Sequence, residues 1–156
     1  MKDLSKLIVC VVGCELVGLL GVPFTASAIP TWYAGLHKPF FAPPNWIFGP
    51  VWTLLYLLMG ISLYLIWKQG LDKKKVKTAV LFFLAQLTLN FIWSPIFFGL
   101  RAPMLGLVTI VAMVAVIAMT MKKFYPLSRL AFYLLVPYLL WVSFATVLNA
   151  AIVVLN

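Results

Sequence analysis

The side chains that could carry chemistry lie inside long apolar segments, and they are aromatic or amide-bearing rather than charged. Tyr56, Asn90, Trp52 and Trp141 are examples. Aromatic rings stack on flat molecules, and a buried amide or hydroxyl fixes a ligand by a hydrogen bond. The sequence shows no nucleophile–base pair, paired carboxylates, glycine-rich phosphate loop or metal-ligand set. Hydrolysis and phosphoryl transfer are therefore disfavoured, and binding, transport or redox chemistry borne by a ligand stays open.

These residues recur at helical spacing in three segments. Gln86, Asn90, Trp93 and Phe97 follow one another at intervals of four, three and four, so they share one helix face. Unpaired amides are costly in lipid, so Gln86 and Asn90 should face the interior of a bundle. Two more stripes have this spacing: Phe48, Trp52 and Tyr56, and Tyr138, Trp141, Ala145 and Asn149. Together the three stripes predict an apolar pocket with a few polar groups, whereas each stripe alone also fits a packed core.

Two local features predict space between helices. Ala145 lies one turn from Trp141, and a small residue beside an indole leaves a slot for a flat molecule or permits close helix packing. Ser94-Pro95 predicts a kink near the end of its segment, because proline disturbs the helical hydrogen bonds.

The elements that must position these residues are membrane-spanning helices. Hydrophobic residues make up 65% of the 156 residues and charged residues 10%, against roughly 45–50% and about 25% in soluble domains. Five apolar stretches have the length that a bilayer requires, at about 7–28, 46–67, 79–98, 104–121 and 130–154. The predicted fold class is all-α, an integral membrane bundle of five transmembrane helices, with residues 1–156 as a single domain.

The net charge of +9 indicates membrane orientation rather than a nucleic-acid partner, because the basic residues lie in short breaks between apolar runs. Ten of the twelve Lys and Arg lie in the N-terminus and the breaks at 68–77 and 122–129, which share one side, and Lys38 and Arg101 lie on the other. The positive-inside rule then places the N-terminus in the cytoplasm and the C-terminus outside. We expect contacts to anionic membrane lipid and a location in a bacterial cell membrane.

The first apolar segment has a second interpretation, a cleaved signal peptide. Met1–Lys6 is basic and Ala26-Ser27-Ala28 resembles a cleavage site, but Glu15 interrupts the apolar run. Glu15 is a candidate functional acid by default, or a residue solvated near the cytoplasmic face. Cys10 and Cys14 fit small buried residues better than metal ligands.

The loop at residues 30–45 is too rich in proline and aromatic residues for a flexible linker. Four of its sixteen residues are Pro and four are aromatic: Trp32, Tyr33, Phe40 and Phe41. Such rings need apolar surface to rest on, and proline makes an ordered loop less costly. The loop is either an interfacial aromatic belt or a lid over the mouth of the bundle, and its length favours the lid. His37 could ligate a haem iron, but a solvated position in the loop is the favoured interpretation. Asn45 precedes the second apolar segment and suits a helix N-cap.

Motifs spread over nearly the whole chain resemble the signature of the TspO/MBR family of tryptophan-rich sensory proteins, which includes the peripheral-type benzodiazepine receptor. The matching residues are Trp32-Tyr33-x-x-Leu36-x-Lys38-Pro39-x-x-x-Pro43-Pro44-x-Trp46, Pro50-Val51-Trp52-Thr53-x-x-Tyr56, Gln86-x-x-x-Asn90-x-x-Trp93-x-Pro95-x-Phe97-Phe98-Gly99 and Val136-Pro137-Tyr138-x-x-Trp141-x-x-x-Ala145-Thr146-x-x-Asn149. The combination is far more specific than any one piece.

The resemblance implies a receptor or carrier for porphyrins and other flat lipophilic ligands, including benzodiazepine-type ligands, with a role in stress or tetrapyrrole signalling and transport. It implies a pocket formed by Tyr33, Pro43, Trp52, Tyr56, Asn90, Trp93, Trp141 and Ala145, with Trp32 and Phe41 in the lid. Protoporphyrin IX or haem is the expected ligand. No tightly bound cofactor and no metal site are expected, and a homodimer is implied.

Two other functions remain open. The resemblance also implies an enzyme, less favoured, that degrades porphyrin by light-dependent oxidation with Trp52 and Trp141 as the catalytic residues. The excited porphyrin itself generates oxidants, so the protein need only hold it near oxidisable indoles. The other alternative is a membrane scaffold for a partner protein, which requires a distinct lipid-facing seam.

Overall fold

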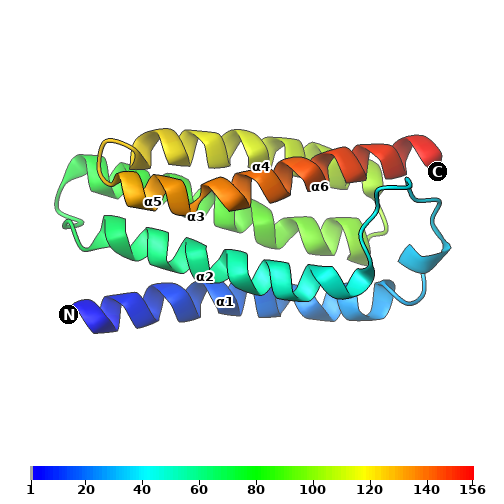
Figure 1. Cartoon of the computed structure of the whole chain (residues 1–156), viewed down its shortest axis with the longest axis horizontal. Coiled ribbons are helices and arrows are strands. Elements are labelled where there is room, and N and C mark those ends of the chain that lie inside the picture. Colours follow the sequence, from blue (N-terminus) through cyan, green and yellow to red (C-terminus); the bar gives the residue numbers. More distant parts are fainter. Residues whose placement is uncertain (1) are drawn as a thin grey trace.

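Five helical spans run back and forth along the long axis of the molecule (Figure 1). This computed structural model describes residues 2–156. The helices are α1 (Asp3–Ala28), α2 (Phe48–Trp67), α3 (Lys74–Ser94), α4 (Pro103–Phe124), α5 (Arg129–Leu134) and α6 (Val136–Leu155). All five spans are long and apolar enough to cross a membrane, and the described residues contain no strand. The predicted all-α bundle of five transmembrane helices is confirmed.

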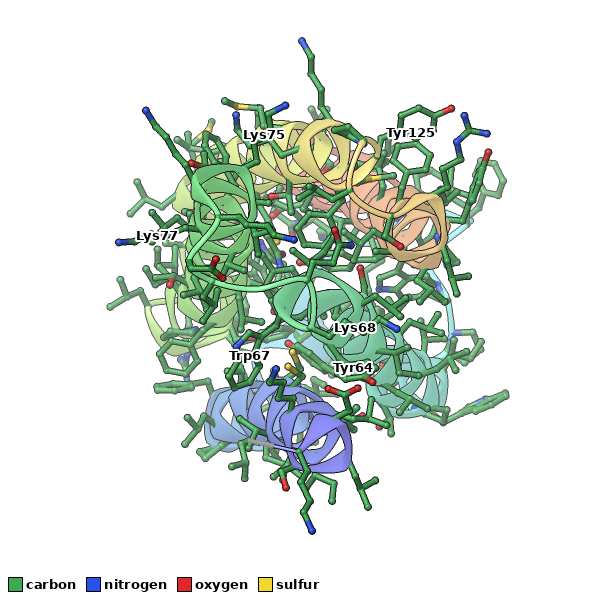
Figure 2. The ribbon with its side chains drawn as sticks, turned by 90° about the vertical axis from the view of Figure 1, so that its left-hand side faces the viewer. Tyr64, Trp67, Lys68, Lys75, Lys77 and Tyr125 are labelled. Carbon is green, nitrogen blue, oxygen red and sulfur yellow. The ribbon has the colours of Figure 1, made fainter. Side chains whose placement is uncertain are left out.

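The spans surround a common core. Helix α1 packs chiefly on α2, α2 packs on α5, α6 packs on α4, and α4 packs on α3. Figure 2 looks onto the end of the bundle that carries the N-terminus, where α1 and α4 lie on opposite edges. Large side chains with under 2% exposure, such as Phe83, Phe124 and Tyr138, fill the middle. The first loop lies at the other end (Figure 1).

Two helices begin earlier than the apolar stretches predict. Helix α1 begins at Asp3 and α3 at Lys74, where the sequence predicted spans from 7 and 79. Backbone hydrogen bonding continues past the apolar run, because exposed charged side chains at a helix end can reach the polar surroundings. Hydropathy therefore locates the membrane-embedded part of each helix and not its full length.

The predicted fifth span, 130–154, consists of two helices. Helix α5 ends at Leu134 and α6 begins at Val136, with Leu135 between them at φ −88° and ψ −10°. Pro137 stands in the first turn of α6 and has no N–H to donate to the preceding turn. The break lets α5 pack on α2 while α6 packs on α4.

The predicted distortion at Ser94-Pro95 takes the form of a wide helical turn. A π-helical turn over Pro95–Gly99, η3, directly continues α3, and the N–H of Leu100 donates to the carbonyl of Pro95 at 2.8 Å. A π-helical turn contains one more residue between hydrogen-bonded groups than an α-helical turn does. Phe97 is thereby buried, with 2% of its surface exposed.

Glycine allows α1 and α2 to approach closely. A Cβ atom at Gly60 would lie 2.5 Å from the Cα of Val11, and one at Gly18 would lie 2.5 Å from the Tyr56 ring. A side chain at Gly60 would thus meet backbone that cannot easily move. The Gly60 contact holds α1 against α2 in the half of the bundle away from the first loop, and Gly18 allows the close approach next to Tyr56.

Candidate ligand-binding cavity

A cavity of about 340 Å³ lies in the half of the bundle beside the first loop. All five spans and the loop contribute to its lining, which is mostly apolar and aromatic. Typical ligand sites have volumes of about 300–1,000 Å³ and are lined in this way. The lining residues that are also exposed, such as Leu19, Val22 and Thr53, lie on α1 and on the first turns of α2. The cavity therefore communicates with the surroundings between these two helices.

Seven of the eight residues expected to bind ligand line this cavity. They are Tyr33, Trp52, Tyr56, Asn90, Trp93, Trp141 and Ala145. Pro43 lies in the first loop, half-buried, and is not part of the lining. The three aromatic stripes thus converge on one space, and Phe48 and Asn149 from the same stripes also line it.

The wall formed by α1 is the part of the site that the sequence did not reveal. Gly18, Gly21 and Thr25 line the cavity from this helix. Their spacing of three and four residues places them on one helix face, and this pattern of small residues was the available signal. Glu15 also lines the cavity, half-buried.

A chain of buried hydrogen bonds forms the inner end of the cavity. The hydroxyl of Tyr56 donates to Asn90 Oδ1 at 2.6 Å, and Asn90 Nδ2 donates to the hydroxyl of Tyr138 at 2.8 Å. The Tyr138 hydroxyl in turn donates to Gln86 Oε1 at 2.7 Å. Gln86 and Asn90 are 1% and 5% exposed, which confirms that both amides face the interior. Tyr56 donates its only hydroxyl proton to Asn90, so its oxygen can act only as an acceptor toward a ligand.

A second hydrogen-bonded group ties Trp93 to α6 and α4. Trp93 Nε1 donates to Asn149 Oδ1 at 3.3 Å, and Asn149 Nδ2 donates to the carbonyl of Pro103 at 2.9 Å. The Trp93 ring also stacks on Phe97, with 4.9 Å between ring centroids. These contacts fix Trp93 as a rigid wall of the cavity.

Trp141 carries the one buried side-chain polar atom in residues 2–156 that has no hydrogen-bond partner, its Nε1. An unsatisfied buried donor costs about 1–3 kcal/mol. The indole packs edge-on against Phe48, with ring centroids 6.0 Å apart, and lines the cavity beside Ala145. The indole of Trp141 thus lines the cavity while its N–H has no partner in the protein.

The first loop folds back over the end of the bundle. Tyr33 is 4% exposed, packs with Phe97 and Leu148, and lines the cavity. Burial raises the pKa of the Tyr33 hydroxyl above its usual range, so this group stays neutral at physiological pH. Lys38 Nζ lies 4.7 Å from the centre of the Tyr33 ring and donates to the Tyr33 carbonyl at 2.8 Å. The position of Tyr33 favours the lid over the aromatic belt.

The loop is also fastened to the C-terminal end of α6. The backbone N–H of His37 donates to Asn156 Oδ1 at 3.0 Å, and Asn156 Nδ2 donates to the His37 carbonyl at 2.9 Å. His37 thus takes part through its backbone. Within residues 2–156, no three His, Cys, Asp or Glu side chains group closely enough to hold a metal ion.

The other loop residues have separate positions. Trp32 packs edge-on against Phe97 and Phe41 against Phe144, at centroid distances of 5.6 and 6.2 Å, and neither lines the cavity. Phe40 is fully exposed and meets only the Phe41 ring edge-on, at 5.5 Å between centroids, so it does not pack on the bundle. The predicted N-cap at Asn45 is wrong: Ile47 is the N-cap position of α2, and Asn45 lies in the short turn before it and lines the cavity.

The fold and the site define an integral membrane protein with an aromatic cavity between its helices. The model of the TspO/MBR family matches residues 10–155, and the chain belongs to this family. The tryptophan-rich protein TspO of Archaeoglobus fulgidus is 47% identical over 155 residues, 99% of both chains. That of Chlorobaculum tepidum is 43% identical over 155 residues, covering 99% of this chain and 98% of the relative. The human translocator protein is 46% identical over 120 residues, 76% of this chain and 70% of the relative.

Proposed function

We propose that this protein is a membrane receptor or carrier that binds porphyrins and other flat lipophilic molecules in the cavity beside the first loop. Family membership supports the coarser role of membrane receptor or transporter, since relatives are named translocator protein and tryptophan-rich sensory protein. The observation that carries the finer proposal is the cavity itself, with Trp52, Trp93 and Trp141 around one space and an unpartnered indole N–H.

The polarity of the cavity suits a porphyrin carboxylic acid such as protoporphyrin IX. Its flat ring system can stack on indoles, and Ala145 leaves room beside Trp141. Its pyrrole N–H groups match the acceptor at Tyr56, and its carboxylates match the donor at Trp141 Nε1. No haem-iron ligand is required for this mode of binding.

Titration of the purified protein with protoporphyrin IX, followed by quenching of tryptophan fluorescence, tests the proposal. We expect saturable quenching, and a large loss of affinity in Ala145→Leu because the added side chain fills the slot. Trp46→Phe is the matched control, since Trp46 is 74% exposed and lies outside the cavity. Quenching that does not saturate, or equal affinities of wild type and Ala145→Leu, would exclude the cavity as the porphyrin site.

The role of the Trp141 N–H can be tested with the same assay. Trp141→Phe keeps an aromatic ring and removes the donor. A hydrogen bond to a charged group contributes about 1.5–3 kcal/mol, so we expect at least tenfold weaker binding of protoporphyrin IX. An alkyl porphyrin that has no carboxylate should lose much less. Equal losses for both porphyrins would argue against an N–H to carboxylate bond.

Light-dependent oxidative degradation of porphyrin is a second candidate, favoured by the positions of Trp52 and Trp141 on the same cavity. Excited porphyrin and O2 would supply the oxidant, and the two indoles would be the nearby oxidisable groups. The test is a product that requires light, O2 and protein, and that disappears in the Trp52→Phe, Trp141→Phe double variant. A rate equal to that of free porphyrin in detergent would reject this activity.

A further inference from the structure

A second concavity, of about 310 Å³, lies in the half of the bundle away from the first loop. It runs between α1, α2 and α3 and shares no lining residue with the cavity described above. We call it the α1–α3 groove. Its lining is uncharged: Val9, Cys10, Gly13, Cys14, Leu63, Trp67, Leu71, Val80, Leu84 and Leu87.

The groove exists because α1 leans on α2 and leaves space toward α3. Gly60 brings α1 close to α2, whereas at Gly13 an added Cβ would meet nothing within 4 Å. Cys10 and Cys14, 3% and 1% exposed, form the floor, and Val9 and Leu84 at the rim are 51% and 45% exposed. Trp67 lines the groove, and Figure 2 shows this residue between α1 and α3. The groove is thus a narrow apolar channel that faces the bilayer.

Two lysines continue the groove toward the basic end of the bundle. Lys6 precedes Val9 and Gly13 by three and seven residues on α1, and Lys77 precedes Val80 and Leu84 by three and seven on α3. Residues at these intervals share a helix face, so each lysine extends one wall of the groove. Figure 2 shows Lys77 projecting outward from α3, while Lys75 points in a different direction.

Three of the other cations at this end interact with aromatic rings. Lys68, Lys123 and Arg129 lie over aromatic rings at 4.7 to 5.5 Å. Lys6 and Lys77 have no such contact among residues 2–156, and Lys77 is exposed. Both ammonium groups therefore remain free to meet an anion.

We propose that the α1–α3 groove is a binding site for an anionic phospholipid, with one acyl chain in the apolar channel and the phosphate between Lys6 and Lys77. The charge pattern selects this occupant: an uncharged channel suits hydrocarbon, and the two cations beyond its end suit an anionic headgroup. Trp67 lies at the same end, as indoles do at membrane interfaces. This site is separate from the cavity beside the first loop and does not depend on the function proposed for that cavity.

Native mass spectrometry of the full-length protein in detergent, titrated with phosphatidylglycerol or phosphatidylcholine of identical acyl chains, tests the site. We expect one phosphatidylglycerol molecule to be retained at concentrations where phosphatidylcholine is lost. Lys77→Gln should weaken its retention about fivefold, the effect of one cation near a lipid surface. Lys75→Gln is the matched control, one exposed lysine on the opposite face of α3, and should have little effect.

A second pair of variants tests the channel rather than the charges. Gly13→Phe adds a ring to a residue that lines the groove, at a position where a Cβ meets nothing within 4 Å, and we expect it to abolish preferential retention of phosphatidylglycerol. Val12→Phe adds the same ring to an exposed neighbour outside the groove and should retain the lipid. Equal retention of the two lipids, or equal losses in Lys77→Gln and Lys75→Gln, would overturn the proposal. A dimer that Gly13→Phe dissociates would instead make the groove an interface between two copies.

Discussion

At the scale of single residues, the interior of this bundle depends on polar groups that satisfy one another. Tyr56, Asn90 and Tyr138 each donate to the next member of one series of hydrogen bonds, and Gln86 accepts the last of them. Each amide and hydroxyl would be costly in lipid if it stood alone. These hydrogen bonds therefore fix the side-chain positions at the inner end of the cavity.

Removal of the central hydroxyl should destabilise the protein. Tyr138→Phe leaves the Asn90 donor and the Gln86 acceptor without partners in a buried site. We expect a loss of about 1–2 kcal/mol in the free energy of unfolding, seen as a lower melting temperature in detergent. Tyr133→Phe is the control, because Tyr133 is 58% exposed. A melting temperature equal to that of the control would contradict the structural importance of the hydrogen-bond chain.

Helical spacing was sufficient to find the side chains on α2, α3 and α6 that line the cavity. Large aromatic residues and amides are conspicuous in an apolar sequence, and their intervals give the shared face. The positions of Gly18 and Gly21 in the cavity wall could not be predicted, because glycine has no side-chain chemistry and contributes only by leaving space for a ligand. The free N–H of Trp141 also could not be predicted, since a missing partner depends on the positions of neighbouring helices.

At the scale of the elements, close packing of α1 on α2 shapes both the cavity and the α1–α3 groove. Gly60→Ala would place a Cβ 2.5 Å from the Val11 Cα and 3.0 Å from the Cys10 carbonyl oxygen. Overpacking of this kind costs about 1–3 kcal/mol, so thermal unfolding should shift to lower temperature. Gly49→Ala adds the same methyl group where nothing lies within 4 Å, and its stability should be unchanged or slightly higher. Similar stabilities of the two variants would show that α1 moves freely on α2.

The attachment of the first loop to α6 gives a second prediction for the elements. Asn156→Ala removes both hydrogen bonds to the His37 backbone, each worth about 1 kcal/mol. Hydrogen exchange of the loop amides should accelerate about 5- to 30-fold. Asn156→Asp keeps an acceptor for the His37 N–H and should give an intermediate rate. No change in either variant would mean that the apolar contacts of Tyr33 alone hold the loop.

Apolar length predicted the number of spans, and the breaks within them were harder to foresee. Pro137 was visible in the sequence, but a proline near the start of a span is compatible with one helix or two. The contact of α5 with α2 decides between these possibilities, and a contact of this kind is set by the whole bundle. Pro95 predicted a distortion, yet the π-helical form depends on how Phe97 fits among its neighbours.

For the molecule as a whole, the asymmetry of charge predicts how it sits in the membrane. Ten of twelve Lys and Arg lie at the end that carries the N-terminus, and Figure 2 shows Lys68, Lys75 and Lys77 there. We expect the N-terminus in the cytoplasm and Asn156 outside. Alkaline phosphatase fused after Asn156 should be active in cells, because this enzyme folds only outside the cytoplasm, and inactive when fused within 68–77. The reverse pattern of activities would refute this orientation. The homodimer implied by family resemblance stays a prediction.

The cavity takes up only the half of the bundle beside the first loop, and its outward-facing residues, Leu19, Val22 and Thr53, lie in that half. A lipophilic compound dissolved in the bilayer therefore meets the cavity from a single leaflet, the one opposite the basic end. The rate at which a compound reaches the protein then depends on how it distributes between the two leaflets as well as on its affinity. In a sealed vesicle with one protein orientation, slow flip-flop of a charged porphyrin would make binding much faster from one face than from the other.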